Sequence, residues 1–443
     1  HEVNIKILLS EMVRSGDMTL KQRNAVLVSM TDEVAHQVLR DNYEQNVLIG
    51  NARAQQFEMV AVHARLLRYL EEHVDLDRAL EALPTPSDLA KRHAAGRGLT
   101  SPEFAVLIAY SKLSLKADLL ASGLPDDPWF QRTVVDYFPA QIRDRYAGDV
   151  ANHPLRREII TNAVANSMVN RGGITYAFRA GEETGARVDQ IARAFVVSRE
   201  VFDLAGYVKA VEALDNVVST EVQTQLYLEF RRLMDRAARW FLTARPAQLD
   251  VAAEVERFAA PVAELAPQLH TILQGTERAR LEARAAQLRS VGVPKELALR
   301  HASLLDQFSL LDIVELSLET GTPPVEVAQV YFHTSEQFGI DEMLTRVSAL
   351  PREDRWDSLA RGAMRDDLYA VLEALAQSVL EASKPGTKAA ARYAAWATAN
   401  EDSVGRAQVA LGAVRALDAP GIAPLSVALR TLRGVVRGGA ANG

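Results

Sequence analysis

The sequence predicts an all-α protein whose helices form two helical subdomains, with little or no β-structure. Apolar residues recur three or four positions apart along most of the chain, which is the spacing of one helix face. Thr followed three residues later by Glu or Gln precedes several of these segments and is typical of helix N-termini. The 443 residues exceed one hydrophobic core, so two or three domains are expected.

The composition excludes several classes of protein. The net charge of −7 is spread along the chain without a long basic run, which argues against nucleic acid as a partner. No apolar run reaches the ~20 residues of a membrane-spanning helix, so a membrane is not an expected partner either. Because cysteine is absent, the chain has no disulfide, thiolate nucleophile or cysteine-ligated metal. This composition fits a cytoplasmic protein, and the cytoplasm is the expected location.

Residues 1–18 are interpreted as an exit segment from a domain that precedes them. The sequence shows no initiator Met and no signal-peptide pattern, and residues 3–14 are apolar on one side. The natural cover of that side would be the preceding domain, so its apolar residues should lack burial in this chain alone. The residues expected to be under-buried are Val3, Ile5, Ile7 and Leu8.

Residues 19–245 form the expected first helical domain. Thr19 with Gln22, and Thr100 with Glu103, have the spacing of capping boxes at the start of helices. Glycine and proline residues punctuate the segments that follow them, as expected for helix ends.

Residues 246–382 form the expected second helical domain. The boundary is placed at Arg245-Pro246, because the sequence beyond it is richer in alanine and poorer in aromatic residues. Residues 383–443 are expected to form Ala-rich terminal helices and a flexible tail.

Residues 153–190 are the least generic part of the chain. The helix expected over 154–171 is apolar over a wide arc. Beside that arc lie Asn162, Asn166 and Asn170, each four residues from the last and therefore stacked on one side. A surface helix would carry Lys and Glu at such positions, so this helix is expected at the centre of the first domain.

The expected neighbours of this helix are the helix that contains Phe104 and the helix that contains Val188. Asn166 is expected to be buried and hydrogen-bonded to the backbone that follows the helix. Gly173 should supply a backbone conformation that a Cβ disfavours. Residues 174–176 are β-prone and are the one short strand that the pattern suggests.

No self-sufficient site for chemistry is visible. The sequence lacks a Gly-rich dinucleotide turn, a P-loop, HExxH and GxSxG, so no catalytic, cofactor-binding or metal-ligating residue is predicted. His63 and His73 are three helical turns apart, which is too far for one zinc site. One interpretation is a stand-alone enzyme with a polar site near Asn166, Asn170 and Glu182. The favoured interpretation is that these amides fix the packing of neighbouring elements.

Short sequences in a specific order resemble the C-terminal region of the large bacterial NAD-specific glutamate dehydrogenases, which follows the catalytic domain. No resemblance is seen after Lys384, and all of these short sequences lie before it. They are HEVNIKILL at 1–9, MTDEVAHQVLRDNYEQ at 30–45, GLTSPEFAVLIAYSK at 98–112, LPDDP at 124–128, YFP at 137–139, HPLRREIITNAVANSMVNRGGITYAFRAGEETGA at 153–186, RAARW at 236–240 and RWDSLARGAMRDDLY at 355–369.

This resemblance implies that the dinucleotide-binding fold and the catalytic Lys and Asp lie in a preceding domain. The implied reaction converts glutamate, NAD and water into 2-oxoglutarate, ammonium and NADH. NAD is then the cofactor of the whole enzyme, and no cofactor is expected in this chain. The implied role of the helical region is assembly or regulation. Its expected partners are its own catalytic domain and further copies of the chain. The alternative is an independent helical adaptor that binds another protein.

Overall fold

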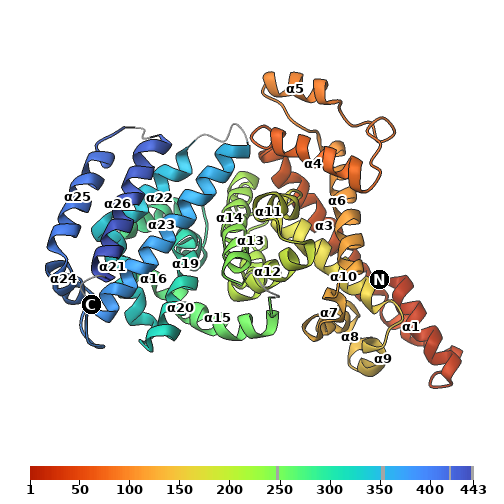
Figure 1. Cartoon of the computed structure of the whole chain (residues 1–443). Coiled ribbons are helices and arrows are strands. Elements are labelled where there is room, and N and C mark those ends of the chain that lie inside the picture. Colours follow the sequence, from red (N-terminus) through yellow and green to blue (C-terminus); the bar gives the residue numbers. More distant parts are fainter. Residues whose placement is uncertain (246–248, 351–354, 419–420, 441–443) are drawn as a thin grey trace. The chain divides into compact units, whose positions relative to one another are not determined.

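Helices account for all regular structure in the described chain. The computed structural model describes residues 1–245, 249–350, 355–418 and 421–440. Within these ranges every regular element is a helix and none is a strand, so the all-α prediction is confirmed (Figure 1). Pro246, at the expected domain boundary, lies outside the described residues. None of the described helices combines the length and apolar character needed to cross a lipid bilayer.

The chain folds into two compact units, each assembled from two chain segments. Unit 1 contains His1–Arg199 and Met234–Glu254, and unit 2 contains Glu200–Leu233 and Val255–Gly443. The segments interleave because one long helix, α14, belongs to unit 2 in its first half and to unit 1 in its second. The domain limits expected from composition stay a prediction.

The helices that lie wholly or mainly in unit 1 are α1 (Glu2–Ser15), α2 (Leu20–Ser29), α3 (Thr31–Ala54), α4 (Val60–His73), α5 (Pro86–Ala94), α6 (Ser101–Ala121), η1 (Leu124–Asp126), η2 (Pro128–Phe130), α7 (Gln131–Tyr137), α8 (Ala140–Arg143), α9 (Ala147–Ala151), α10 (Arg156–Ser167), the π-helical turn η3 (Met168–Gly172), α11 (Tyr176–Thr184) and α12 (Val188–Val201).

The helices that lie wholly or mainly in unit 2 are α13 (Leu204–Glu212), α14 (Thr220–Ala244), α15 (Val251–Leu265), η4 (Ala266–Gln268), α16 (Leu269–Ile272), α17 (Gly275–Ser290), α18 (Lys295–Ala302), α19 (Leu304–Phe308), α20 (Leu310–Thr320), α21 (Pro324–Phe338), α22 (Ile340–Ala349), α23 (Arg355–Glu381), α24 (Ala389–Ala399), α25 (Glu401–Arg415) and α26 (Ile422–Ala440).

The expected capping boxes begin helices in the structure. The Thr19 N–H donates to Gln22 Oε1 at 2.9 Å, and the Gln22 N–H donates to Thr19 Oγ1 at 3.2 Å. The Thr100 N–H donates to Glu103 Oε2 at 2.7 Å. These bonds satisfy backbone donors that the first turn of a helix leaves unpaired.

Helix α10 packs on α6, which carries Phe104, and on α7. Its Ile160 and Val164 are buried. Arg199 of α12 donates to Ser167 Oγ at 3.4 Å at the end of the helix. These neighbours agree with the central position in unit 1 that the wide apolar arc predicts.

The short strand suggested at residues 174–176 is not formed. Gly173 has φ 107° and ψ 160°, which is the expected glycine conformation, and a turn there leads directly into α11. Tyr176 is buried and packs so closely on Gly172 that a Cβ at residue 172 would lie 2.8 Å from the ring. Burial of this ring overrides the local β-propensity, and the described part of the chain contains no strand with which the segment could pair.

The expected under-burial of the N-terminal segment is wrong for two of its residues. Ile5 and Leu8 are only 1% and 2% exposed, whereas Val3 is 69% exposed. The buried side of α1 lies within unit 1 itself, where Asn4 is hydrogen-bonded to Tyr137 of α7 and to His153 in the loop before α10. A further domain is therefore not needed to bury this side.

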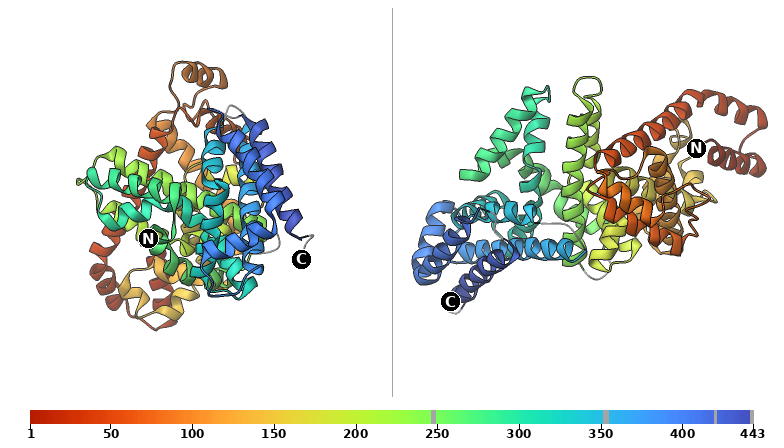
Figure 2. Two further views of the ribbon diagram at one scale, coloured as in Figure 1. Left: turned by 90° about the vertical axis from the view of Figure 1, so that its left-hand side faces the viewer. Right: turned by 90° about the horizontal axis from the view of Figure 1, so that it is seen from above.

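The core of unit 2 is a stack of long helices. Helix α21 packs on α20, α23 and α24, and α26 packs on both α23 and α25. The helices at the C-terminal end of the chain lie side by side in both views of Figure 2. The segment between α23 and α24 is held to α21, because the Gly386 N–H and the buried Arg392 guanidinium both donate to Glu326 Oε2, at 3.0 and 3.1 Å.

A group of buried acids surrounds one guanidinium in unit 2. Arg280 Nη2 donates to Asp306 at 2.8 Å and to Asp341 at 3.1 Å. Glu277 accepts from Ser335 Oγ at 2.6 Å. Burial, with Asp306 and Asp341 nearby, raises the pKa of Glu277 to about 8. Glu277 is therefore protonated in the folded chain at neutral pH.

We predict that Glu277 makes unit 2 less stable as the pH rises from about 5 to 8. Its pKa in the unfolded chain is near 4.5, so in this window the folded chain holds a proton that the unfolded chain has lost. Glu277→Gln stays neutral and should remove ~2–4 kcal/mol of this loss. Urea unfolding across the window measures the effect. Glu282→Gln, on the exposed side of the same helix, is the control, and parallel profiles for Glu277→Gln and wild type would contradict the prediction.

Candidate functional site

The carboxylate of Glu44 joins α3 to the end of α10. It accepts hydrogen bonds from Arg40 Nε at 3.1 Å and from Asn170 Nδ2 at 3.2 Å, and it forms an ion pair with Arg171. Arg40 lies one helical turn before Glu44, while the other two donors lie in η3. The side chains of Glu44 and Arg171 are 20% and 13% exposed, so the pair is largely shielded from water.

Asn4 joins α1 to α7 and to the loop before α10. Its Nδ2 donates to the Tyr137 hydroxyl at 3.0 Å, and its backbone carbonyl accepts from His153 Nε2 at 3.0 Å. The His153 ring is fully buried, and its Nδ1 accepts from the Leu155 N–H at 3.0 Å. The acceptor role of Nδ1 places the ring proton on Nε2, where it is needed for the bond to α1.

Glu33 makes a third connection from the N-terminal segment. Its Oε1 accepts from the Ala140 N–H at 3.0 Å, which satisfies a backbone donor in the first turn of α8. Asn4, Glu33 and Glu44 are called the anchor residues below. All three bind partners more than a hundred positions away in the sequence.

Charged groups next to Glu44 are partly buried with it. Burial raises the pKa of Asp41, and the charge of Glu44 raises it further. Burial lowers the pKa of Lys112, while Asp41 and Glu44 act in the opposite direction. Acids and bases are thus interleaved around the contact, as in a structural ion-pair network, which also perturbs pKa values.

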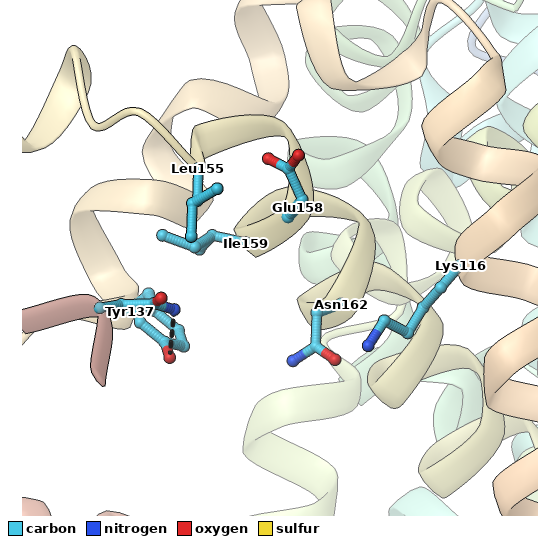
Figure 3. Close-up of a pocket in the computed structure, with 7 residues that line it drawn as sticks. Lys116, Tyr137, Leu155, Glu158, Ile159 and Asn162 are labelled. Atoms are coloured by element: carbon cyan, nitrogen blue, oxygen red, sulfur yellow. Dashed lines mark hydrogen bonds between the residues drawn. The ribbon is translucent and has the colours of Figure 1, made fainter. Parts of the chain in front are cut away.

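A cavity of about 260 Å³ lies beside the Asn4 contact. Figure 3 shows Lys116 and Asn162 extending toward one another from neighbouring helices. The lining offers an ammonium, a carboxylate, amides and a phenol, but no nucleophile with an adjacent base, so it lacks a catalytic constellation. The lining residues are Asn4, Lys116, Tyr137, Leu155, Glu158, Ile159 and Asn162.

The residues named for a stand-alone enzyme do not line this cavity. Asn170 is bonded to Glu44, and Glu182 forms an ion pair with Arg65 at 3.1 Å. Asn166 is half-buried and not buried as expected, because η3 turns the buried amide contact onto Asn170, one turn further on. Among the described residues, no three His, Cys, Asp or Glu side chains are grouped to hold a metal ion.

The anchor residues could not be singled out from the sequence. The spacing of Arg40 and Glu44 indicates an ion pair along one helix, but not the third partner Arg171. Asn4 and Glu33 are ordinary polar residues of helices, and only the fold brings them to Tyr137 and Ala140. The stripe of Asn162, Asn166 and Asn170 was the one sequence pattern that pointed to the contact with Glu44.

These contacts define an all-α region that is joined by polar contacts to the N-terminal segment. Comparison with known proteins identifies both parts. The family "Glutamate dehydrogenase, C-terminal" matches residues 96–434, and the family "Bacterial NAD-glutamate dehydrogenase, catalytic domain" matches residues 1–52. The first match covers more than half of the chain, so the chain belongs to the C-terminal family of glutamate dehydrogenases.

Three curated relatives are each called NAD-specific glutamate dehydrogenase. The Mycobacterium tuberculosis protein is 41% identical over 99% of this chain, and the Pseudomonas aeruginosa protein is 40% identical over 98%. The Halomonas elongata protein is 36% identical over 90%. The chain spans about a quarter of the length of these relatives, 27%, 27% and 25% in turn. The family resemblance of the sequence is thereby confirmed.

The described residues do not fit a bound NAD. A dinucleotide is held at the carboxyl edge of a parallel sheet, where a Gly-rich turn leads from a strand into a helix. The described ranges contain helices and no strand, so they offer no such crevice. No step of hydride transfer is therefore assigned to residues of this chain.

We predict that Asn170, and not Asn166, carries the structural role expected of the amide stripe. Asn170 is 6% exposed and donates to Glu44, so Asn170→Ala should cost ~1–3 kcal/mol because it leaves the partly buried Glu44 carboxylate short of a hydrogen bond. Asn166→Ala should cost less than ~0.5 kcal/mol. Chemical denaturation of the two variants tests this, and equal losses would contradict it.

Proposed function

We propose that this chain is the non-catalytic helical region of an NAD-dependent glutamate dehydrogenase, and that it supports the catalytic domain in assembly or regulation. The whole protein would convert glutamate, NAD and water into 2-oxoglutarate, ammonium and NADH. The names of the relatives support this reaction. NAD would be bound by the preceding part of the protein.

The position of the anchor residues carries the proposal. All three lie in residues 1–52, which match the catalytic-domain family, and their partners lie in residues 96–434, which match the C-terminal family. The two family regions therefore fold as one unit at this point and do not meet through a flexible linker. A displacement of α10 would pull on α3 through the Glu44–Arg171 ion pair.

The physical role proposed for the anchors is to hold the last helices of the catalytic domain in place. A partly buried ion pair with further hydrogen bonds has a defined geometry, because a shifted partner leaves a desolvated charge unpaired. We also propose that the helical region binds further copies of the chain and that the protein works in the cytoplasm. The match at residues 1–52 favours this proposal over an independent adaptor.

The chain by itself should have no glutamate dehydrogenase activity and no measurable affinity for NAD. The physical reason is the missing Gly-rich turn at a helix N-terminus, where a pyrophosphate needs close approach of the backbone. Calorimetric titration with NAD is the measurement. Micromolar binding of NAD to this chain would contradict the proposal that NAD is bound by the preceding part of the protein.

Glu44→Gln should weaken the support of the catalytic domain in the full-length protein. The change removes the charge opposite Arg171, and a loss of ~1.4 kcal/mol would make thermal inactivation about tenfold faster. The measurement is the half-life of NAD-dependent glutamate oxidation at a fixed temperature. KM for NAD should stay unchanged, because no anchor residue is proposed to contact the cofactor.

Glu182→Gln is the matched control for this variant. Glu182 and Glu44 are both 20% exposed and both pair with an arginine, but Glu182 and Arg65 lie outside the catalytic-domain match. Equal half-lives for the two variants would mean that the anchor contributes only general stability, and the proposed role would be wrong.

A further inference from the structure

A long part of the N-terminal segment is folded but not covered. From Leu20 to Val47 the only buried residue is Met30, and α2 buries none of its ten residues. Burial resumes at Leu48, where α3 packs on α6 and η3. In the right-hand view of Figure 2, α2 and the start of α3 lie at the margin of unit 1.

Each of the two uncovered helices exposes large aliphatic side chains among its charged ones. Leu20 and Val28 are 62% and 76% exposed on α2, and Val38 and Leu39 are 46% and 67% exposed on α3. These aliphatic side chains lie on two consecutive helices that bury almost nothing, and such helices are suited to contact with another protein surface. These four residues are called the α2–α3 surface below.

The spacing of these residues adds a second observation. Leu20, Asn24 and Val28 follow one another at intervals of four residues, so they share a side of α2. Positions 35, 38, 39 and 42 of α3 are Ala, Val, Leu and Asn, which share a side of that helix and are all exposed. Lys21, seven residues before Val28, and Asp32, seven residues before Leu39, border these positions, so each side combines aliphatic and charged residues.

The family match identifies what could cover this surface. Residues 1–52 match the catalytic-domain family, yet the chain spans only about a quarter of the length of its relatives. We infer that the α2–α3 surface is where the preceding part of the catalytic domain packs, in the same polypeptide, by covering these aliphatic side chains. This inference rests on the proposed function, and it names the face that the catalytic domain occupies.

Hydrogen exchange of the α2 amides tests the inference without a mutation. The amides are compared in this chain alone and in the full-length protein. Covered helices open less often, so exchange in α2 should be at least about tenfold slower in the full-length protein. Exchange in α25, which carries the exposed Val409, should be unchanged. Equal exchange of α2 in the two proteins would overturn the inference.

Val28→Asp and Val409→Asp form a matched pair of variants, because both valines are 76% exposed on helices. In this chain alone, neither variant should change exchange in α2 by more than about twofold. In the full-length protein, Val28→Asp should speed exchange in α2 at least about tenfold, because a carboxylate would be buried against an apolar face. Val409→Asp should leave exchange in α2 of the full-length protein unchanged. Equal effects of both variants in the full-length protein would overturn the inference.

Two further outcomes separate the possible failures. If α2 of this chain alone becomes protected as its concentration is raised, a second copy covers the surface and the inference is wrong. If the full-length protein oxidises glutamate with NAD but leaves α2 unprotected, only the inference fails. If α2 is protected in a full-length protein without that activity, the inference stands and the proposed function fails.

Discussion

The ion pair between Glu44 and Arg171 constrains how the N-terminal segment lies against the centre of unit 1. It joins a helix of the N-terminal segment to the turn that ends the central helix α10, more than a hundred residues later. A carboxylate that is largely removed from water needs its partners, so the two helices are held in one arrangement. The neighbouring bond from Asn170 makes that arrangement more specific, because an amide donor must also be aligned.

Apolar burial stabilises unit 1, whereas its polar contacts restrict how the helices can lie against one another. The apolar arc of α10 supplies burial against α6 and α7, which is favourable but tolerates small shifts of one helix over another. The anchor residues remove that freedom, because each of their hydrogen bonds has a narrow range of distance and angle. Gly172 and Gly173 make the arrangement possible, since one admits the Tyr176 ring and the other reverses the chain.

The N-terminal 52 residues combine positions that are bonded to the rest of unit 1 with helices that are almost entirely exposed. Asn4 of α1, Glu33 of α3 and Glu44 of α3 are tied into unit 1, whereas α2 and the first half of α3 bury almost none of their side chains. A segment with these properties is suited to join unit 1 to another domain, because it is already bonded to unit 1 and also exposes aliphatic side chains. The match of the same residues to the catalytic-domain family agrees with this arrangement.

The sequence by itself determined the all-α class, the capped starts of helices such as those at Thr19 and Thr100, and the family. These depend on residues within a few turns of each other, or on ordered motifs, and both are legible along the chain. Tertiary structure alone decided that Asn170 and not Asn166 is buried, that residues 174–176 turn into a helix, and that Ile5 and Leu8 are covered. Each of these outcomes depends on partners far away in the sequence. Local spacing fixes which side of a helix is apolar, but it carries no information on which distant residue will lie against it.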